Sequence, residues 1–416
     1  MNTWLLCILL IILVQYVLEV GVALLNIKAL SPQLPEEFAQ ETTQDEYAKS
    51  QEYTRITTYV SLIENTWSTV LTLIFFLSGG FNRVDIWARG FGFGSIPTGL
   101  IYMGALLFLL MLIGLPFSLY STFVVENRFG FNKTTIKTFI LDLIKGVLLA
   151  ISLGAPVLAM VLWFFEGTGS LAWFYCWTGV VIVTIILQYL APVLIMPLFN
   201  TFTPLPDGPL RKAIISYAEK QDFKMQGIFT MDGSKRSTKL NAFFTGFGRF
   251  RKIVFYDTLL EKLTDEEIVA VLAHEMGHFK LHHIAKMIVA SILHTGILFY
   301  VLSFTLNNKD IFEAFGMINM SIYASLIFFG FLFSPINLLV SIVFNIFSRR
   351  NEFSADVFAA KTTGSPENLI TGLKKLSRVN LSNLTPHPFH VFFHYSHPPI
   401  LERISALNQS HISSES

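Results

Sequence analysis

Residues 264–306 read TDEEIVAVLAHEMGHFKLHHIAKMIVASILHTGILFYVLSFTL and join two kinds of sequence. The segment begins with Thr264 and Glu267, which have the spacing of a capping box at the start of a helix. Residues 284–306 are mostly apolar and long enough to cross a bilayer, which takes about 20 residues. We therefore expect one helix that begins outside the membrane, continues through His283 and runs on into a membrane span.

Seven apolar stretches of this length occur along the 416-residue chain. They occupy residues 4–25, 59–77, 100–120, 138–165, 171–195, 284–306 and 320–347. Hydrophobic residues make up 52% of the chain and charged residues only 14%, against about 25% in a typical soluble domain. The composition predicts a multi-span membrane protein in contact with the lipid bilayer. It excludes a disordered chain, a disulfide scaffold and a nucleic-acid binder with a basic surface, since the net charge is +1.

Basic residues in the short loops indicate how the spans are oriented, because cytoplasmic loops carry an excess of Lys and Arg. Such residues follow the first, third and seventh spans: Lys28, Lys49, Arg55, Arg128, Lys133, Lys137, Arg349 and Arg350. The opposite side carries Arg83, Arg89 and Lys309. We expect the C-terminus and the segment between the fifth and sixth spans on the cytoplasmic side, and the N-terminus on the other side.

Polar residues inside the spans have two interpretations. They line a water-filled interior, or they pair between helices and extend toward the membrane surface. The sequence favours neither. The residues concerned are Gln15, Glu19, Glu64, Asp142, Lys145, Gln188, His294 and Asn337.

The segment 197–283 has the composition of an ordinary soluble domain. Residues 210–220 predict a short helix, and residues 227–231, 240–245 and 250–256 predict strands. Gly246, Phe247 and Gly248 predict a hairpin turn between the last two strands. The fold class we expect is mainly α: seven membrane spans with a small α+β domain.

The chemistry of the chain is indicated by His274, Glu275 and His278, which form an HExxH motif. Residues i and i+4 share one face of a helix, so the two imidazoles can bind one Zn²⁺. In metalloproteases with this motif the intervening glutamate is the general base. The competing interpretation is a pair of surface or core histidines that share helical spacing by chance.

A catalytic zinc site needs a third protein ligand. His282 lies about 12 Å along the helix axis from His274, so these two and His278 cannot all reach one ion. Glu352 is two spans further on and therefore on the same membrane side. Asp356, one turn later, could accept the second ring N–H of a zinc-binding histidine. The alternative is that Glu352 is a solvated helix residue paired with an arginine.

A second polar cluster lies near the C-terminus. It contains His387, His390, His394, His397 and Arg403. A histidine and an arginine beside a zinc site could stabilise the oxyanion of a tetrahedral intermediate. Histidine-rich loops are also common on protein surfaces, and composition does not separate the two.

Taken together, these motifs resemble the type I CAAX prenyl endopeptidases, integral-membrane zinc metallopeptidases related to the HtpX heat-shock proteases. The resemblance covers nearly the whole chain. It rests on residues 126–135 (ENRFGFNKTT), 197–200 (PLFN), 241–246 (NAFFTG), 274–278 (HEMGH), 349–352 (RRNE) with Asp356, and 396–399 (SHPP) with Arg403.

The resemblance implies a gluzincin-type zinc protease domain and a chamber enclosed by the spans, with the zinc at its cytoplasmic end. It also implies the roles of the site residues. These are zinc ligation by His274, His278 and Glu352, a general base at Glu275, transition-state roles for His397 and Arg403, and a substrate-aligning edge strand at Asn241, Ala242 and Phe243.

We therefore expect a zinc endopeptidase with one Zn²⁺ that hydrolyses peptide bonds near the C-terminus of prenylated CAAX-type or other membrane-associated proteins. The alternatives are a zinc-binding multi-span transporter and an inactive protease-like scaffold. We expect no nucleic-acid partner. The expected location is the bacterial inner membrane or the endoplasmic reticulum membrane, with the active site towards the cytoplasm. The expected division of the chain is 1–196, 197–283, 284–347 and 348–416.

Overall fold

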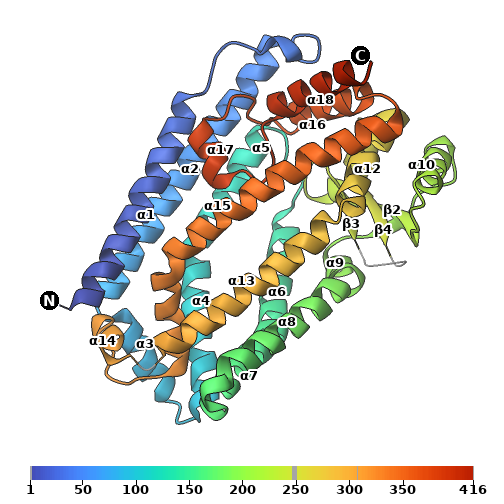
Figure 1. The fold of residues 1–416 in the computed structure, drawn as a ribbon. Coiled ribbons are helices and arrows are strands. Elements are labelled where there is room, and N and C mark those ends of the chain that lie inside the picture. Colours follow the sequence, from blue (N-terminus) through green and yellow to red (C-terminus); the bar gives the residue numbers. More distant parts are fainter. Residues whose placement is uncertain (1, 246–250, 307, 416) are drawn as a thin grey trace.

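The computed structural model describes residues 2–245, 251–306 and 308–415 (Figure 1). Within these residues, seven helical segments are long and apolar enough to cross a membrane. They are Thr3–Lys28, Gln44–Leu77, Ser95–Arg128, Ile136–Gly167, Gly169–Phe199, His283–Thr305 and Ile322–Thr363. The seven expected spans are confirmed. Several helices extend beyond their apolar stretches, because polar sequence can continue a helix outside the bilayer.

Four of the spans are single helices: α1 (Thr3–Lys28), α2 (Gln44–Leu77), α13 (His283–Thr305) and α15 (Ile322–Thr363). The other three spans each contain a π-helical segment. The third consists of α4 (Ser95–Tyr120), η2 (Ser121–Val125) and α5 (Glu126–Arg128). The fourth consists of α6 (Ile136–Leu149), η3 (Ala150–Gly154) and α7 (Ala155–Gly167). The fifth consists of η4 (Gly169–Leu171), α8 (Ala172–Leu190), η5 (Ala191–Ile195) and α9 (Met196–Phe199).

The remaining described helices are short or lie at the ends of the bundle. They are η1 (Glu36–Phe38), α3 (Gly80–Arg89), α10 (Pro209–Lys220), η6 (Gly233–Lys235), α11 (Asp257–Leu260), α12 (Asp265–Lys280), α14 (Lys309–Ala314), α16 (Glu367–Val379), α17 (Pro388–His394) and α18 (Ile400–Glu415). Figure 1 shows α16, α17 and α18 at the same end of the molecule as α12 and the sheet, whereas α3 and α14 lie at the opposite end.

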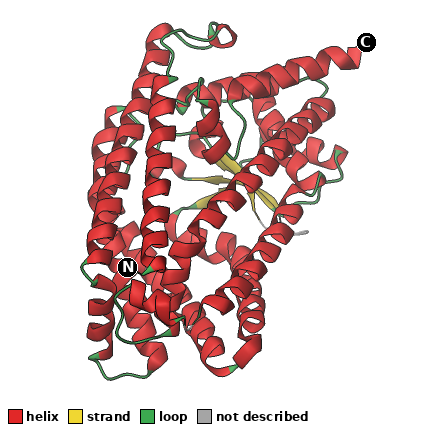
Figure 2. Cartoon of the chain, turned by 60° about the vertical axis from the view of Figure 1, so that its left-hand side comes forward, coloured by secondary structure: helices red, strands yellow, loops and turns green. Residues whose placement is uncertain are grey.

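A small sheet lies among the helices (Figure 2). Its strands are β1 (Phe202–Pro204), β2 (Gly227–Met231), β3 (Ala242–Thr245) and β4 (Lys252–Tyr256), in the order β1-β2-β4-β3. β2 and β4 are parallel, and the other two pairings are antiparallel. The three expected strands and the pairing of the last two are confirmed. The turn expected at residues 246–248 lies outside the described residues. β1 was not expected, because it is short and ends in proline, which cannot donate a ladder hydrogen bond.

The expected continuous helix through His283 into the sixth span is wrong. α12 ends at Lys280, and α13 begins at His283. Between them His282 adopts a left-handed backbone conformation with φ +58°. This conformation is uncommon for a residue other than glycine and interrupts the helix. The break changes the direction of the chain directly after the HExxH motif.

α15 connects the membrane bundle to the other end of the molecule (Figure 1). It runs unbroken from Ile322 to Thr363 and includes both an apolar span and Glu352. The boundary that we expected at 347 falls inside this helix, and the division of the chain into four parts stays a prediction. Because one helix carries a membrane span and Glu352, that side chain has a fixed place relative to the bundle.

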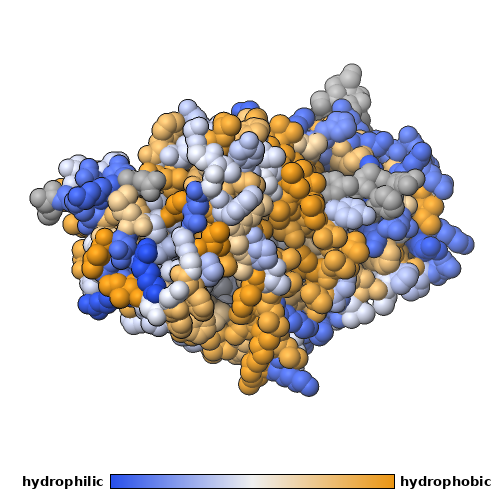
Figure 3. Space-filling model, turned by 90° about the horizontal axis from the view of Figure 1, so that it is seen from below, coloured by the Kyte–Doolittle hydropathy of each residue, from blue (hydrophilic) through white to orange (hydrophobic). Residues whose placement is uncertain are grey.

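The outer surface of the bundle is apolar, as lipid contact requires. Seen from the end that carries α3, α7 and α14, apolar residues cover much of the middle of the molecule (Figure 3). A cavity of about 1040 Å³ lies between α1, α2, α4 and α15, and Gln15, Glu19 and Asn337 are among its lining residues. Asp142, by contrast, pairs with Arg236. Some polar residues within the spans thus line a cavity and at least one forms an ion pair with a residue outside the membrane, and whether the cavity holds water stays a prediction.

Candidate active site

α12 is fixed at its start by the expected capping box. Thr264 accepts a hydrogen bond from the Glu267 backbone N–H, and the Glu267 carboxylate accepts one from the Thr264 N–H. Lys375 of α16 makes a 2.7 Å ion pair with the buried Glu267 carboxylate. Further along α12, Leu272 and Met276 are fully buried in the core of the soluble end. The helix that carries the HExxH motif is thus held by packing and by charge.

Gly277 sets the distance between α12 and α15. A Cβ atom at this position would lie 3.0 Å from the Cα of Ala355 and 3.2 Å from its carbonyl oxygen. Real Cβ atoms seldom approach backbone this closely, so the two helices pack at a separation that suits glycine. The close approach brings His274 and His278 against Glu352, which is one turn from Ala355.

Two histidine nitrogens and the carboxylate of Glu352, carried by these two helices, converge. The Nε2 atoms of His274 and His278 are 3.2 Å apart. Oε1 of Glu352 lies 3.2 Å from Nε2 of His278, and Oε2 lies 3.4 Å from Nε2 of His274. His282 is exposed and does not belong to this group of potential metal ligands.

These distances fit a metal ion. Ligand atoms about 2.0–2.1 Å from a tetrahedral zinc lie roughly 3.3 Å from one another. In the described residues, Oε2 of Glu352 is buried without a hydrogen-bond partner. Arg403 Nη1 is 3.5 Å from this oxygen, which is long for a hydrogen bond, and a cation bound closer would compensate its burial more fully. Two imidazoles and one carboxylate are also the donor set of several catalytic zinc sites.

Asp356 and Arg403 surround the far side of the His274 ring. Asp356 Oδ1 lies 2.8 Å from His274 Nδ1. Arg403 donates two hydrogen bonds to the same carboxylate, at 2.6 Å and 2.8 Å, and both side chains are almost fully buried. Burial lowers the pKa of His274, but hydrogen bonds to Asp356 and Glu352 outweigh burial and raise the pKa to about 9. The surroundings of His274 therefore favour positive charge.

The other two expected catalytic residues also lie at this site. Glu275 follows His274 on α12, and burial raises the pKa of its carboxyl, although both histidines of the motif act in the opposite direction. His397 Nε2 is 3.4 Å from Glu352 Oε1, and its side chain is 66% exposed. His397 can therefore contact both the donor group and a molecule that arrives from solvent.

His278 has a partner that the sequence did not reveal. Its Nδ1 lies 3.1 Å from Nδ1 of His283, which is 5% exposed. Both rings line a cavity of about 500 Å³ between α8, α13 and α15. The sequence signal for this contact was His283 itself, five residues after His278. It did not predict the contact, because in an unbroken helix that residue points away from His278.

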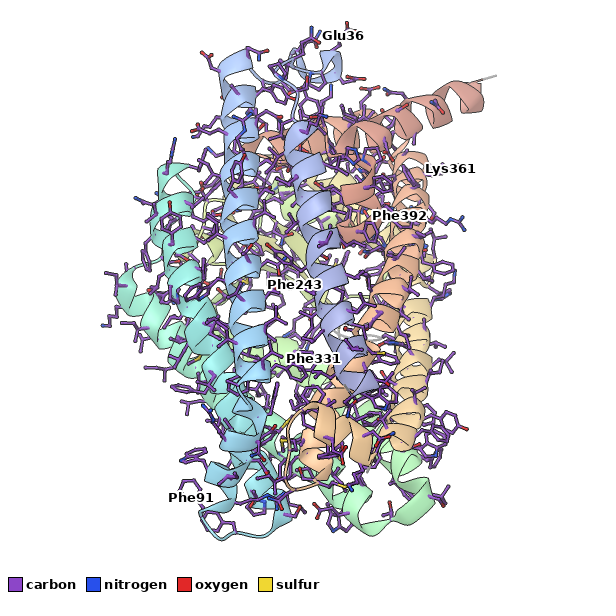
Figure 4. All side chains as sticks on the ribbon, turned by 90° about the vertical axis from the view of Figure 1, so that its left-hand side faces the viewer. Glu36, Phe91, Phe243, Phe331, Lys361 and Phe392 are labelled. Carbon is purple, nitrogen blue, oxygen red and sulfur yellow. The ribbon has the colours of Figure 1, made fainter. Side chains whose placement is uncertain are left out.

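The expected substrate-binding strand, β3, lies at one end of the sheet. Asn241, directly before it, is exposed, and its carbonyl accepts a hydrogen bond from the Tyr256 N–H. The Asn380 side chain bonds both the N–H and the carbonyl of Leu240, at 2.8 Å and 3.1 Å. Phe243 of this strand lies near the middle of the molecule, behind α1 and α2, in the view of Figure 4. The start of the strand is thus held in place while Asn241 is accessible.

Two family models together match most of the chain. Residues 23–201 match the CAAX prenyl protease N-terminal region with five membrane helices, and residues 204–411 match peptidase family M48. Among curated proteins, the chain is 36% identical to CAAX prenyl protease 1 homolog of Arabidopsis thaliana, covering 95% of each chain. It is 34% identical to CAAX prenyl protease 1 of Saccharomyces cerevisiae, covering 91% of this chain and 88% of that protein.

A solved structure agrees with these matches. The crystal structure of S. mikatae Ste24p superimposes with a TM-score of 0.93 at 33% identity, covering 98% of this chain and all of the other. The comparisons support the expected peptidase and give no support to a transporter. The chain therefore belongs to peptidase family M48, as a membrane-spanning metalloendopeptidase of the CAAX prenyl protease group.

Proposed function

We propose that His274, His278 and Glu352 hold one Zn²⁺ and that this chain cleaves peptide bonds near the C-terminus of prenylated CAAX-type proteins. The observation that carries the proposal is the convergence beside Glu275 of one ligand atom each from His274, His278 and Glu352, all within 4.8 Å of one another. When bound there, zinc supplies a Lewis acid that polarises the scissile carbonyl and lowers the pKa of water.

Glu275 is the general base of this proposal. Its carboxylate takes a proton from the attacking water and gives it to the nitrogen of the leaving amine. The raised pKa of Glu275 suits both steps, because proton transfer is most efficient when the pKa of the catalytic group is near the working pH. The partly buried position limits competing contacts with bulk water.

Arg403 and His397 are suited to stabilise the negative charge that develops on the carbonyl oxygen. Nη1 of Arg403 lies 3.5 Å from Oε2 of Glu352, next to the donor group. His397 approaches the same carboxylate from the exposed side. Asp356 positions both the His274 ring and the Arg403 guanidinium, since it contacts each of them.

The substrate is proposed to bind as an added strand. An extended peptide can pair with the edge of a sheet, and β3 is such an edge. Asn241, Ala242 and Phe243 would align the peptide by backbone hydrogen bonds. The name shared by the relatives, CAAX prenyl protease, supports a prenylated substrate. A prenyl chain is apolar and suits a site that adjoins a cavity between membrane-spanning helices, which His278 lines.

The test of this proposal measures zinc and cleavage on the same purified protein. We expect about one zinc per chain and hydrolysis of a farnesylated CAAX peptide. The matched substrate is the same peptide with serine in place of the modified cysteine. Equal cleavage of both peptides would remove the prenyl requirement, and a protein that contains no zinc after purification with added zinc would contradict the metal site.

We further propose that the site faces the cytoplasm, supported by the basic residues of the loops after the first, third and seventh spans. Single cysteines at Lys224, Asn408 and Lys309, in a background without Cys7 and Cys176, test this orientation. An impermeant thiol reagent should label the first two positions from the cytoplasmic face and the third from the opposite face. Labelling of Lys224 and Asn408 positions from different sides would contradict the proposal.

A further inference from the structure

The two histidines of the HExxH motif use their second ring nitrogens differently. His274 Nδ1 faces the carboxylate of Asp356. His278 Nδ1 faces another imidazole, that of His283, at 3.1 Å. His283 is buried, it begins α13, and its Nε2 lies 3.4 Å from Oγ of Ser354. His283 takes no part in the proposed proton transfer or in binding the metal.

Hydrogen-bond chemistry fixes the direction of this chain of contacts. If His278 presents Nε2 to a metal, that nitrogen carries no proton, and the proton of the neutral ring is on Nδ1. His278 Nδ1–H then donates to Nδ1 of His283. The His283 proton is consequently on Nε2 and points to Oγ of Ser354. Ser354 in turn donates to a backbone carbonyl of its own helix, at Asn351 or Arg350. Every member of this chain has a donor or an acceptor of the required kind.

The helix break explains how His283 reaches this position. In a continuous helix, a residue five positions after His278 would project from a different face. The left-handed conformation of His282 ends α12 and lets the chain turn. His283 is therefore brought back beside His278, while His282 itself is exposed. The helix break at His282, which the sequence pattern did not predict, creates the contact between His278 and His283.

We infer that His283 is a positioning residue that holds the His278 ring in the tautomer and orientation required of a metal ligand. The inference rests on the proposed zinc site. A hydrogen-bonded partner on the second nitrogen orients a ligating histidine, and its removal typically lowers metal affinity about 10–100-fold. His283 would not touch the substrate or the metal and would act through His278 alone.

The test is the zinc affinity of purified, metal-depleted protein, measured by competition with a chromophoric chelator. We expect His283→Leu to weaken zinc binding about 10–100-fold, because leucine removes the acceptor. His283→Asn should bind zinc more tightly than His283→Leu, since the side-chain oxygen of asparagine can accept at nearly the same place. His282→Asn, the same change one residue earlier, should match the wild type, because asparagine tolerates the left-handed conformation.

Thermal unfolding of the metal-free variants separates loss of affinity from loss of fold. If His283→Leu does not fold, His283→Met replaces it, because methionine adapts to irregular space without offering a strong acceptor. The inference is overturned if the folded Leu or Met variant binds zinc as tightly as the wild type, or if His282→Asn loses as much affinity. A wild-type protein that binds no zinc would instead overturn the proposed function itself.

Discussion

The surroundings of His274 and His278 differ although the two residues are one helical turn apart. His274 lies in the core, with the buried carboxylate of Asp356 and the buried guanidinium of Arg403 against its ring. His278 borders a cavity between membrane-spanning helices, and the partner of its second ring nitrogen is the imidazole of His283. One side of the site is therefore fixed by charge within a packed core, and the other is fixed by a single hydrogen bond beside open space.

This difference predicts that the surroundings of the two histidines contribute unequally to the stability of the fold. Charged, fully paired groups in a core are costly to disturb, so the His274 side should contribute to the stability of the fold as well as to the site. The His278 side should be alterable with less effect on folding, because the His278 side chain is 18% exposed, against 9% for His274, and borders a cavity. The two sides are joined by Glu352, whose oxygens face one histidine each.

The largest expected effect is a loss of zinc occupancy on substitution of Glu352, whose carboxylate faces both histidines. Glu352→Ala removes the carboxylate that faces both histidines and leaves two ligands, so zinc occupancy should fall nearly to zero after dialysis. The matched control is Glu313→Ala, which alters an exposed glutamate of α14 and should retain zinc. The zinc content of the two purified variants tests whether Glu352 is the third ligand. Retention of zinc by Glu352→Ala would mean that the third ligand lies elsewhere.

The residue between the two histidines is expected to affect turnover and not metal binding. Glu275→Gln keeps the shape of the side chain but cannot accept the proton, so kcat should fall about 10²–10⁴-fold with zinc content unchanged. Glu266→Gln, an exposed change on the same helix, should leave kcat unaltered. A Glu275→Gln variant with nearly wild-type turnover would remove Glu275 from the proposed mechanism.

Much of this site could be predicted from sequence, because its main signals are local spacings. The two histidines of the motif could be predicted as ligands of one metal ion because i and i+4 residues share one face of a helix. Glu352 could be predicted as the third ligand because an even number of membrane crossings separates it from the motif. The contacts of His283 could not be predicted, since they depend on one left-handed residue at position 282. The pairing of Arg403 with Asp356 joins residues 47 positions apart and depends on how α18 packs on α15.

The fold was predictable to a similar degree. Span number follows from hydrophobic length, and the strands β2, β3 and β4 follow from residue type. The sequence did not predict β1, because this strand is stabilised by pairing with β2 and not by the strand preference of its own three residues. The short helices α16 and α17 were also missed, since their positions are set by packing against other parts of the chain.

The next largest expected effect is a loss of fold stability on substitution of Asp356, which contacts His274 and Arg403. Asp356→Asn removes the charge of the carboxylate that accepts both hydrogen bonds from the buried Arg403 and leaves only the longer 3.5 Å contact with Glu352, so we expect the protein to be destabilised by about 3–5 kcal/mol. The matched variant is Asp207→Asn, which breaks an exposed ion pair with Arg211 and should cost about 0–1 kcal/mol. Denaturation in mild detergent, followed by tryptophan fluorescence, measures both. Equal costs would show that the charged groups around His274 do not stabilise the fold in the way proposed.

The smallest effect concerns the separation of the two helices on which both histidines depend. Gly277→Ala places a methyl group 3.0 Å from the Cα of Ala355, so α12 and α15 must move apart, at a cost of about 1–3 kcal/mol. Because the shift would move His274 and His278 together relative to Glu352, zinc affinity should fall along with stability. Gly146→Ala is the matched control: it lies inside α6 with no atom within 4 Å of the new methyl group and should be neutral or stabilising. Chelator competition and denaturation of both variants test this expectation. If Gly277→Ala kept wild-type values in both measurements, the close approach of α12 to α15 would not be what sets the geometry of the site.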